Sequence, residues 1–464
     1  MSEPHELSAL EQGALIAKGE LSARELTEHY LARIDTWNAE VGAYITVCAD
    51  LARSQADEAD AVVRAGVRSL GPLHGVPVPV KDTVDVAGVR TTYGSLAFAD
   101  HVPQSDDAVV DRLRDEGTVM LGKTNLSEFE LSGHAENRIA APARTPWDLS
   151  RSAGGSSGGG AAAVAAGLAP IAHGSDSAGS VRGPASCCGL VGFKPSRGLL
   201  PGRRDHDISG LTTAGALART VADAAALCEA MSGTTMDLLS STSERERGTR
   251  GRLRVALIER ATVPGVEIHA ECRSAVRETA ALLEGLGHSV EPAELIADGA
   301  LGRAFTVVWP VLTSLREVPP ERAELLLPLT RHLRAQGEEY GGRAFALALR
   351  EFTAIAERTA RHFSEYDVIL SPTLSRPPLR VGELRDDEDP ARESAAMVGF
   401  SPFTCLYNVT GQPAVSLPLH WTGDGLPVGV MLAAHRGRDA LLFALAAQLE
   451  AAGPGPRRRP DTAC

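Results

Sequence analysis

Two serine-bearing segments of small residues carry the side chains best suited to covalent catalysis in this sequence. Residues 153–160 read AGGSSGGG and contain Ser156, and residues 174–182 read GSDSAGSVR and contain Ser180. Small residues let a substrate approach the backbone, where consecutive N–H groups can hold an oxyanion. Taken alone, the first segment is also compatible with a flexible linker and the second with a tight turn.

The glycine-rich segment admits two more specific interpretations. A phosphate-binding loop requires Lys followed by Ser or Thr after its second glycine, whereas Gly159 is followed by Gly and Ala, which excludes that loop. Residues 154–158, GGSSG, fit the G-x-S-x-G pattern of a nucleophile elbow, but residues 149–152 make a poor preceding strand. The helix-forming alanines from residue 161 onward instead favour a glycine loop that leads into a helix.

A serine nucleophile needs a base, and the lysines of this chain are few. The 46 basic residues include only Lys18, Lys81, Lys123 and Lys194 as lysines. This scarcity is typical of a GC-rich genome, but a guanidinium cannot lose its proton, so a retained lysine can mark a need for an amine. Lys81 ends the apolar run 76–80. A lysine with a pKa of about 10.4 is neutral only about 0.04% of the time at pH 7, and burial can lower that pKa by up to roughly 3–5 units. A structural salt bridge from Lys81 to Asp82 or Asp85 is the competing interpretation.

The elements that must position these residues alternate between helices and strands. The periodicity predicts helices within residues 1–65 and at 109–114, 161–167, 220–231, 274–286, 300–365 and 439–451. Buried strands are predicted at 119–122, 253–258, 368–370 and 415–417, and residues 76–80 and 168–172 form two further apolar runs. A capping box at Ser22 and Glu25 begins one of the first helices. Strands mixed with helices throughout indicate one large α/β unit with a helical insertion.

Composition excludes several classes of protein. A net charge of −13 and a pI near 5.5 argue against nucleic-acid binding, and 44% hydrophobic with 23% charged residues is typical of a globular chain. Seven cysteines without a C-x-x-C pair favour reduced thiols in a cytoplasmic protein. No signal peptide is visible, the longest apolar stretch is too short to span a membrane, and no histidine or cysteine cluster indicates a metal. We therefore expect a cytoplasmic protein without a cofactor.

Taken together, the segments resemble the amidase signature family of serine hydrolases. The motifs that carry this resemblance occur in order along the chain: GPLHGVPVPVKD (71–82), GKTNLSEF (122–129), PWDLSR (146–151), GGSSGG (154–159), GSDSAGSVR (174–182), GFKP (192–195), ARTVAD (218–223), SPT (371–373), Asn408, Gly411, Pro413 and GLPVG (425–429). The match covers residues 20–230 and 366–450 and leaves residues 296–350 largely uncovered. The number of these motifs and their order along the chain carry the resemblance.

The resemblance implies a Ser–Ser–Lys catalytic triad and a single amidase domain over residues 1–464. Its fold is a mixed central β-sheet covered by helices on both faces, with residues 66–230 as the catalytic core. Ser180 corresponds to the nucleophile, Ser156 to a bridging serine held by a cis peptide, and Lys81 to the base. The backbone N–H groups of Ser177, Ala178, Gly179 and Ser180 are then expected to form the oxyanion hole. No cofactor or metal is implied.

Two positions depart from the family pattern near the nucleophile. Ala178 replaces a customary glycine, which can narrow the acyl pocket, and Gly183 replaces a branched residue, which can open space beside Ser180. We expect Asp176 and Arg182 to order the loop rather than react, and we expect the adjacent cysteines at 187 and 188 to lie in the core.

Three functions remain open from the sequence. The first is hydrolysis of a small-molecule amide, the second is the glutaminase subunit of a tRNA-dependent amidotransferase, and the third is a silent binding protein on the same fold. We expect a small-molecule amide as the partner, rather than nucleic acid or a membrane, and a homodimer is compatible with the sequence. Substrate specificity is expected in the helical insertion 296–350 and in residues 132–141, where Phe305 and Trp309 form either an acyl pocket or a core stripe. The tail, residues 453–464, is expected to be disordered.

Overall fold

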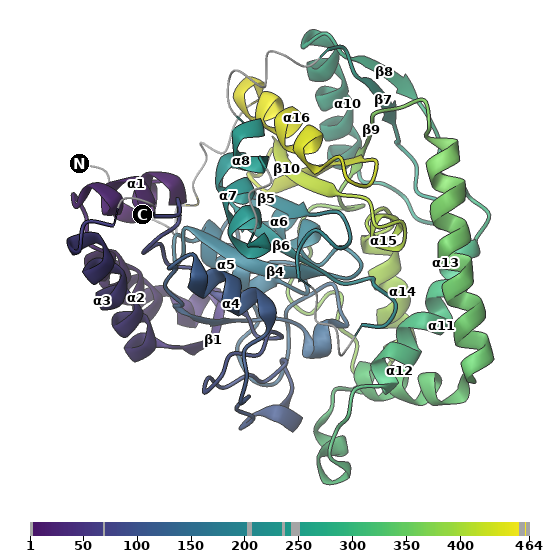
Figure 1. Cartoon of the computed structure of the whole chain (residues 1–464). Coiled ribbons are helices and arrows are strands. Elements are labelled where there is room, and N and C mark those ends of the chain that lie inside the picture. The colour runs from purple at the N-terminus through teal and green to yellow at the C-terminus, as the bar shows by residue number, and fades with distance from the viewer. Residues whose placement is uncertain are drawn as a thin grey trace.

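The N-terminal part of the chain is a layer of three helices. The computed structural model describes residues 3–67, 70–201, 207–233, 237–242, 251–453 and 460. After a short 3-10 helix η1 (Pro4–Glu6), helices α1 (Ala9–Lys18), α2 (Ala23–Val41) and α3 (Ala49–Arg64) lie together at one side of the molecule (Figure 1). The predicted capping box at Ser22 and Glu25 is confirmed, since each side chain accepts a hydrogen bond from the other residue's backbone N–H.

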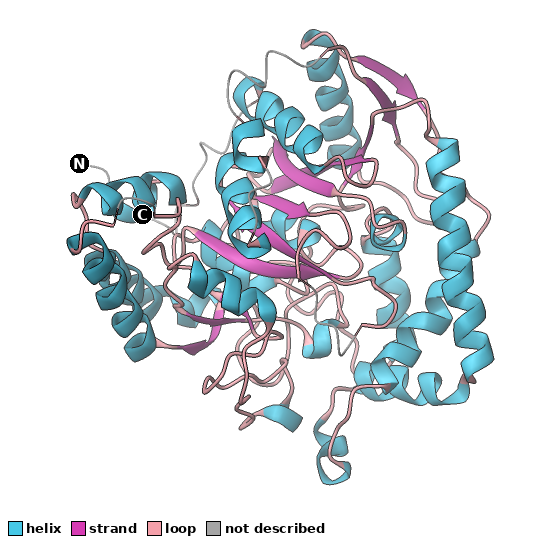
Figure 2. Cartoon of the chain, viewed as in Figure 1, coloured by secondary structure: helices cyan, strands magenta, loops and turns pink. Residues whose placement is uncertain are grey.

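A mixed eight-stranded sheet forms the centre of the molecule (Figure 2). Its strands are β4 (Ile171–Asp176), β5 (Val191–Lys194), β6 (Thr213–Ala218), β7 (Arg254–Leu257), β8 (Ser289–Pro292), β9 (Val368–Pro372), β10 (Ala414–Trp421) and β11 (Pro427–Ala434). They lie in the order β4-β6-β5-β10-β11-β9-β7-β8, antiparallel from β4 to β9 and parallel from β9 to β8. The mixed sheet expected from the resemblance is therefore confirmed.

Helices cover both faces of this sheet because its strands bury both sets of alternating side chains. In β4, Ile171 belongs to the same hydrophobic cluster as helices α7 (Val221–Ser232) and α16 (Asp439–Ala452), whereas Ala172 belongs to the cluster that contains α5 (Gly158–Ala165) and α6 (Arg182–Cys188). Helix α10 (Ala270–Gly285) packs against β9, β10 and β11, and the short helix α8 (Leu238–Ser241) packs against α7 and α16.

A smaller three-stranded sheet carries the predicted base. Its strands are β1 (Tyr44–Val47), β2 (Val80–Lys81) and β3 (Gly122–Thr124), in the order β1-β3-β2. A strand was predicted at 119–122, but the observed strand β3 begins only at Gly122. Val119 forms an isolated bridge to Pro77 instead of a strand. Near this sheet the chain also forms helix α4 (Ala108–Asp115) and the 3-10 helices η2 (Leu96–Phe98) and η3 (Glu128–Glu130).

The helical insertion lies at the side of the molecule opposite the N-terminal helices (Figure 1). It consists of α11 (Ala300–Ser314), the 3-10 helix η4 (Pro320–Leu325), α12 (Pro328–Glu339) and α13 (Gly342–His362), followed later by α14 (Pro390–Phe400) and α15 (Cys405–Val409). Phe305 and Trp309 stack on each other, with ring centroids 5.2 Å apart, within a hydrophobic cluster of α11 and α13. Of the tail predicted to be disordered, residues 454–459 and 461–464 lie outside the described residues.

Candidate active site

Lys81 lies at the end of β2 with its side chain fully buried. Its Nζ is 2.8 Å from Ser156 Oγ, 2.9 Å from Ser175 Oγ and 2.7 Å from Glu130 Oε1. These three partners come from the glycine loop, from β4 and from η3, so segments far apart in sequence converge on one amine. The predicted base and the predicted bridging serine are thus in direct hydrogen-bond contact.

The glycine loop is joined to the loop that carries Ser180. The peptide bond between Gly155 and Ser156 is cis, and a Cβ at Gly155 would lie 2.2 Å from the backbone oxygen of His134, so only glycine fits. The backbone N–H of Ser157 donates to the carbonyl of Ser180 at 3.1 Å, and helix α5 begins directly afterwards. The bridging serine and the predicted nucleophile are therefore held on two hydrogen-bonded loops.

Ser180 lies just beyond β4 and is 9% exposed, so it remains at the border of the buried site. The preceding residue, Gly179, has a φ of 127°, and a Cβ there would lie 2.4 Å from the hydroxyl of Thr404. Both the dihedral angle and the close approach require glycine at this position. At Gly183, a Cβ would meet Leu374 at 3.6 Å, an ordinary contact distance.

A buried ion pair orders this loop, as the sequence predicted. The carboxylate of Asp176 accepts hydrogen bonds from the N–H groups of Gly179 at 2.7 Å and Val181 at 3.1 Å, and Arg182 donates to it through Nε at 2.9 Å and Nη2 at 2.8 Å. Asn408 donates to the same carboxylate at 2.9 Å. Burial alone raises the pKa of Asp176, but the Arg182 guanidinium and the hydrogen bonds hold that pKa well below its usual range.

The four N–H groups expected to form the oxyanion hole differ in their hydrogen bonding. That of Gly179 already donates to Asp176. Those of Ser177, Ala178 and Ser180 have no acceptor among the residues that the structure describes. Three N–H groups around Ser180 are thus available for a developing oxyanion.

The competing interpretation of Lys81, a salt bridge to Asp82 or Asp85, does not hold in the structure. Lys81 instead pairs with Glu130, while Asp82 lies 3.3 Å from Lys123 and Asp85 accepts a hydrogen bond from the Tyr93 hydroxyl. Successive side chains of an extended segment point to opposite sides, which separates Lys81 from Asp82. Glu130 was missed, because no spacing in the sequence relates it to Lys81.

The other buried lysines and the adjacent free cysteines at 187 and 188 have structural surroundings. Lys123 donates to the carbonyl of Val84 at 2.6 Å, and Lys194 donates to that of Pro195 at 2.8 Å. Burial lowers the pKa of Lys194 to about 7, so a depressed lysine pKa does not by itself identify a catalytic base. Burial also raises the pKa of Cys187 and Cys188, and both thiols lie in the core as predicted.

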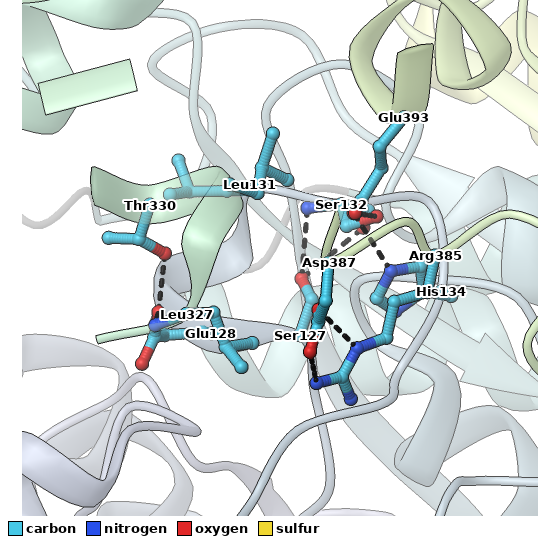
Figure 3. A pocket seen from close by; sticks show the side chains of 11 residues that line it. Ser127, Glu128, Leu131, Ser132, His134, Leu327, Thr330, Arg385, Asp387 and Glu393 are labelled. Atoms are coloured by element: carbon cyan, nitrogen blue, oxygen red, sulfur yellow. Dashed lines mark hydrogen bonds and ion pairs between the residues drawn. The ribbon is translucent and has the colours of Figure 1, made fainter. Parts of the chain in front are cut away.

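A pocket lies beside the segment that carries Glu130 (Figure 3). It is lined by residues of three parts of the chain: Ser127, Glu128, Leu131, Ser132 and His134; Leu327, Leu329 and Thr330; and Arg385, Asp387 and Glu393. Within it, His134 contacts Glu393 at 3.1 Å and Arg385 pairs with Asp387 at 2.9 Å. The lining draws on both stretches in which the sequence placed specificity, 132–141 and 296–350, whereas Phe305 and Trp309 are absent from it.

One cluster of potential metal ligands escaped sequence inspection. Glu3, His5 and His29 bring ligand atoms within 4.8 Å of one another, but the two imidazoles are already hydrogen-bonded to each other at 3.0 Å. This cluster belongs to the N-terminal helices rather than to the loops of Ser156 and Ser180.

No helix in the described ranges is long and apolar enough to cross a bilayer.

The family model for Amidase matches residues 25–443, which is most of the chain. The chain belongs to the Amidase family. This amidase is 38% identical to AmiB2 of Mycobacterium bovis, which is named as an amidase, over 98% of the chain and 97% of that protein. It is 35% identical to the 6-aminohexanoate-cyclic-dimer hydrolase of Paenarthrobacter ureafaciens, over 98% of the chain and 96% of that protein.

Solved structures agree with this assignment. The amidase superposes on a structure of 6-aminohexanoate cyclic dimer hydrolase with a TM-score of 0.89 and 33% identity, covering 100% of both chains. It superposes on the peptide amidase of Stenotrophomonas maltophilia with a TM-score of 0.83 and 28% identity, covering 98% of this chain and 99% of the other. The protein is therefore a hydrolase of carbon–nitrogen bonds with the amidase signature fold.

Proposed function

We propose that this amidase hydrolyses a carboxamide bond of a small molecule, with Ser180 as the nucleophile and Ser156 and Lys81 as its proton relay. The contact that carries the proposal is that of the buried Lys81 Nζ with Ser156 Oγ, at 2.8 Å. A fully buried amine beside a serine hydroxyl suits general-base catalysis, because burial disfavours the charged form of an amine. The backbone hydrogen bond from Ser157 to Ser180 supports the proposal, because it joins the loop of Ser180 to the loop of Ser156.

In the acylation step, neutral Lys81 accepts the hydroxyl proton of Ser156 while Ser156 Oγ accepts the hydroxyl proton of Ser180. Ser180 Oγ bonds to the amide carbonyl carbon, and the carbonyl electron pair moves to oxygen as a tetrahedral oxyanion. The carbon–nitrogen bond then breaks, and Ser156 returns a proton to the leaving amine while Lys81 reprotonates Ser156. Water attacks the acyl-enzyme by the same proton route and releases the carboxylic acid.

The backbone N–H groups of Ser177, Ala178 and Ser180 stabilise the oxyanion in this scheme. Removal of one such donor in a serine hydrolase lowers kcat by a factor of about 10²–10³. The Gly179 N–H plays a different part, because it holds the loop to Asp176. The buried Asp176–Arg182 pair thus orients the neighbouring donors and contributes no proton to the reaction.

The substrate class we propose is a linear or cyclic carboxamide of a small molecule. Two proteins similar to this chain are named for such bonds, a hydrolase of the 6-aminohexanoate cyclic dimer and a peptide amidase. The pocket beside Glu130 is lined by leucines and ion-paired polar groups, and Lys81, Ser156 and Ser180 are not among its lining residues (Figure 3).

A panel of amides tests the proposed function. The panel contains aryl amides, alkyl amides, the 6-aminohexanoate cyclic dimer, a peptide C-terminal amide and free glutamine, with release of the amine or ammonia as the readout. We expect turnover of at least one small amide and its loss in Ser180→Ala, while the exposed Ser150→Ala control stays active. Full turnover by Ser180→Ala would refute the assignment of the nucleophile. Activity confined to glutamine and stimulated by a partner protein would instead indicate a glutaminase subunit.

A further inference from the structure

The contact between Glu130 and Lys81 has no part in the proton relay just described. Glu130 Oε1 lies 2.7 Å from Lys81 Nζ, and only 12% of the Glu130 side chain is exposed. The same carboxylate accepts hydrogen bonds from the hydroxyl of Ser175 and, at 2.9 Å, from that of Thr83. A carboxylate with three such partners is fixed in place beside the amine.

The backbone holds Glu130 in this position through an unusual turn. Phe129 and Glu130 have φ angles of 49° and 66°, in the left-handed region that non-glycine residues rarely adopt. Phe129 is buried beneath the guanidinium of Arg316, which lies 4.8 Å from its ring centroid, and its backbone N–H donates to the carbonyl of Tyr93. Surrounding contacts therefore fix the conformation that directs the Glu130 carboxylate toward the lysine.

The carboxylates next to Lys81 and next to its partner Ser175 have ion-pair partners of their own. Asp82 lies beside Lys123, and Asp176 at the end of β4 is paired with Arg182. On β4, His173 Nδ1 accepts a hydrogen bond from the backbone N–H of Lys81 at 3.4 Å, and Arg316 lies over the ring of Phe129. The carboxylate of Glu130 is in direct contact with the amine, so its charge acts on Lys81 at the shortest range.

We propose that Glu130 is a positioning residue that sets the pH at which Lys81 becomes an effective base. This inference rests on the proposed function of Lys81. A neighbouring carboxylate stabilises the ammonium form, so it opposes the effect of burial and moves the gain of activity to higher pH. At the same time the carboxylate holds Nζ within hydrogen-bond distance of Ser156. Glu130 therefore fixes the geometry of the base and also limits its activity in mildly acidic solution.

The test measures how fast a fluorophosphonate labels Ser180 as a function of pH, so it needs no knowledge of the natural substrate. Glu130→Gln keeps an amide oxygen for the hydroxyl and amine donors but removes the charge. The labelling rate should rise with pH as Lys81 loses its proton, and in Glu130→Gln we expect this rise, the acidic limb of the pH profile, about one to three pH units below that of the wild type. This is the size of pKa shift that a nearby opposite charge causes. On that limb each unit corresponds to a tenfold faster reaction at a given pH.

Two further variants separate charge from position. Glu130→Asp keeps the charge, and we expect an acidic limb close to that of the wild type. Glu130→Ala removes both the charge and the anchor, so we expect the shifted limb together with a lower plateau rate at high pH, which Glu130→Gln restores. Glu321→Gln, which removes an exposed carboxylate, serves as the matched control and should leave the profile unchanged.

The outcomes distinguish this inference from the proposed function. If Ser180 is labelled and labelling depends on Lys81, but the profiles of Glu130→Gln and the wild type coincide, only the role of Glu130 is overturned. If a Glu130→Asp profile shifts as far as that of Glu130→Gln, charge is not the cause and the inference is likewise overturned. If the wild type is not labelled on Ser180, the proposed function and the inference fall together.

Discussion

The buried ion pair of Asp176 and Arg182, which orders the loop that carries Ser180, gives the most informative perturbation, Asp176→Asn. The substitution preserves size but removes the negative charge opposite Arg182, whose side chain is fully buried. It also replaces one carboxylate oxygen, which accepts hydrogen bonds from N–H groups, with an NH₂ group, which cannot accept them. In the wild type, the backbone N–H groups of Gly179 and Val181 and the Nε and Nη2 atoms of Arg182 donate to that carboxylate.

The expected loss of stability follows from the uncompensated guanidinium. Removal of one partner of a buried pair costs about 3–5 kcal/mol, because the remaining charge stays buried without a counter-ion. At 1.36 kcal/mol for each factor of ten, this corresponds to roughly a 10²- to 10⁴-fold change in the folding equilibrium. Since Asp176 also anchors Gly179, we expect the variant to lose labelling at Ser180 even where it stays folded.

Urea unfolding followed by circular dichroism, together with the labelling rate at low denaturant, measures both effects. Asp50→Asn is the control, because the Asp50 carboxylate is fully exposed. This substitution should leave the free energy of unfolding and the labelling rate unchanged. The pKa of Asp176 is depressed in the folded state, so its contribution to stability is present above its ordinary value of 3.8 and is lost as the pH falls below it. Wild-type stability and wild-type labelling of Asp176→Asn at pH 7 would refute the ordering role of the pair.

Two further predictions concern stability away from the loop of Ser180. The buried carboxylate of Glu128 accepts hydrogen bonds from Ser95 Oγ, Leu327 N–H and Thr330 Oγ1. Glu128→Ala should therefore lower the free energy of unfolding by about 1–3 kcal/mol and speed hydrogen exchange in the first turn of α12. Unchanged exchange in that turn would contradict this prediction. Burial lowers the pKa of His420, but hydrogen bonds to Glu271 and Glu278 outweigh it and raise that pKa above 6.5. The contribution of His420 to stability is therefore fully present below pH 6.5 and is lost as the pH rises through the folded-state pKa. The unfolding midpoint of the wild type should fall over this pH range, and the fall should be smaller in His420→Gln. An identical pH trend in that variant would show that His420 is not its source.

Local patterns were sufficient to predict much of the fold. The capping box at Ser22 located the start of α2, and the apolar run 76–80 placed Lys81 at the end of a buried segment, of which only Val80 joins Lys81 in strand β2. These features depend on neighbours in sequence, where helix and strand periods act directly. The strand predicted at 119–122 was displaced because pairing with β1 and β2, rather than hydrophobicity, defines β3.

Contacts between distant segments could not be read from the sequence in the same way. Glu130 reaches Lys81 across 49 residues, and a left-handed turn that no local residue preference predicts determines its direction. The order of the eight strands likewise depends on pairings between segments such as β5 and β10. Resemblance to a family placed Lys81, Ser156 and Ser180 in one mechanism, whereas periodicity alone left each of them with a structural alternative.

The proposed mechanism requires Lys81 to activate Ser180 through Ser156. It is tested most directly by fluorophosphonate labelling at pH 7, with the adduct mapped by peptide mass spectrometry in the wild type and in Lys81→Met. We expect a single adduct on Ser180 in the wild type and a labelling rate lower by several orders of magnitude in folded Lys81→Met. An adduct on another residue, or a Lys81→Met rate equal to that of the wild type, would contradict the mechanism.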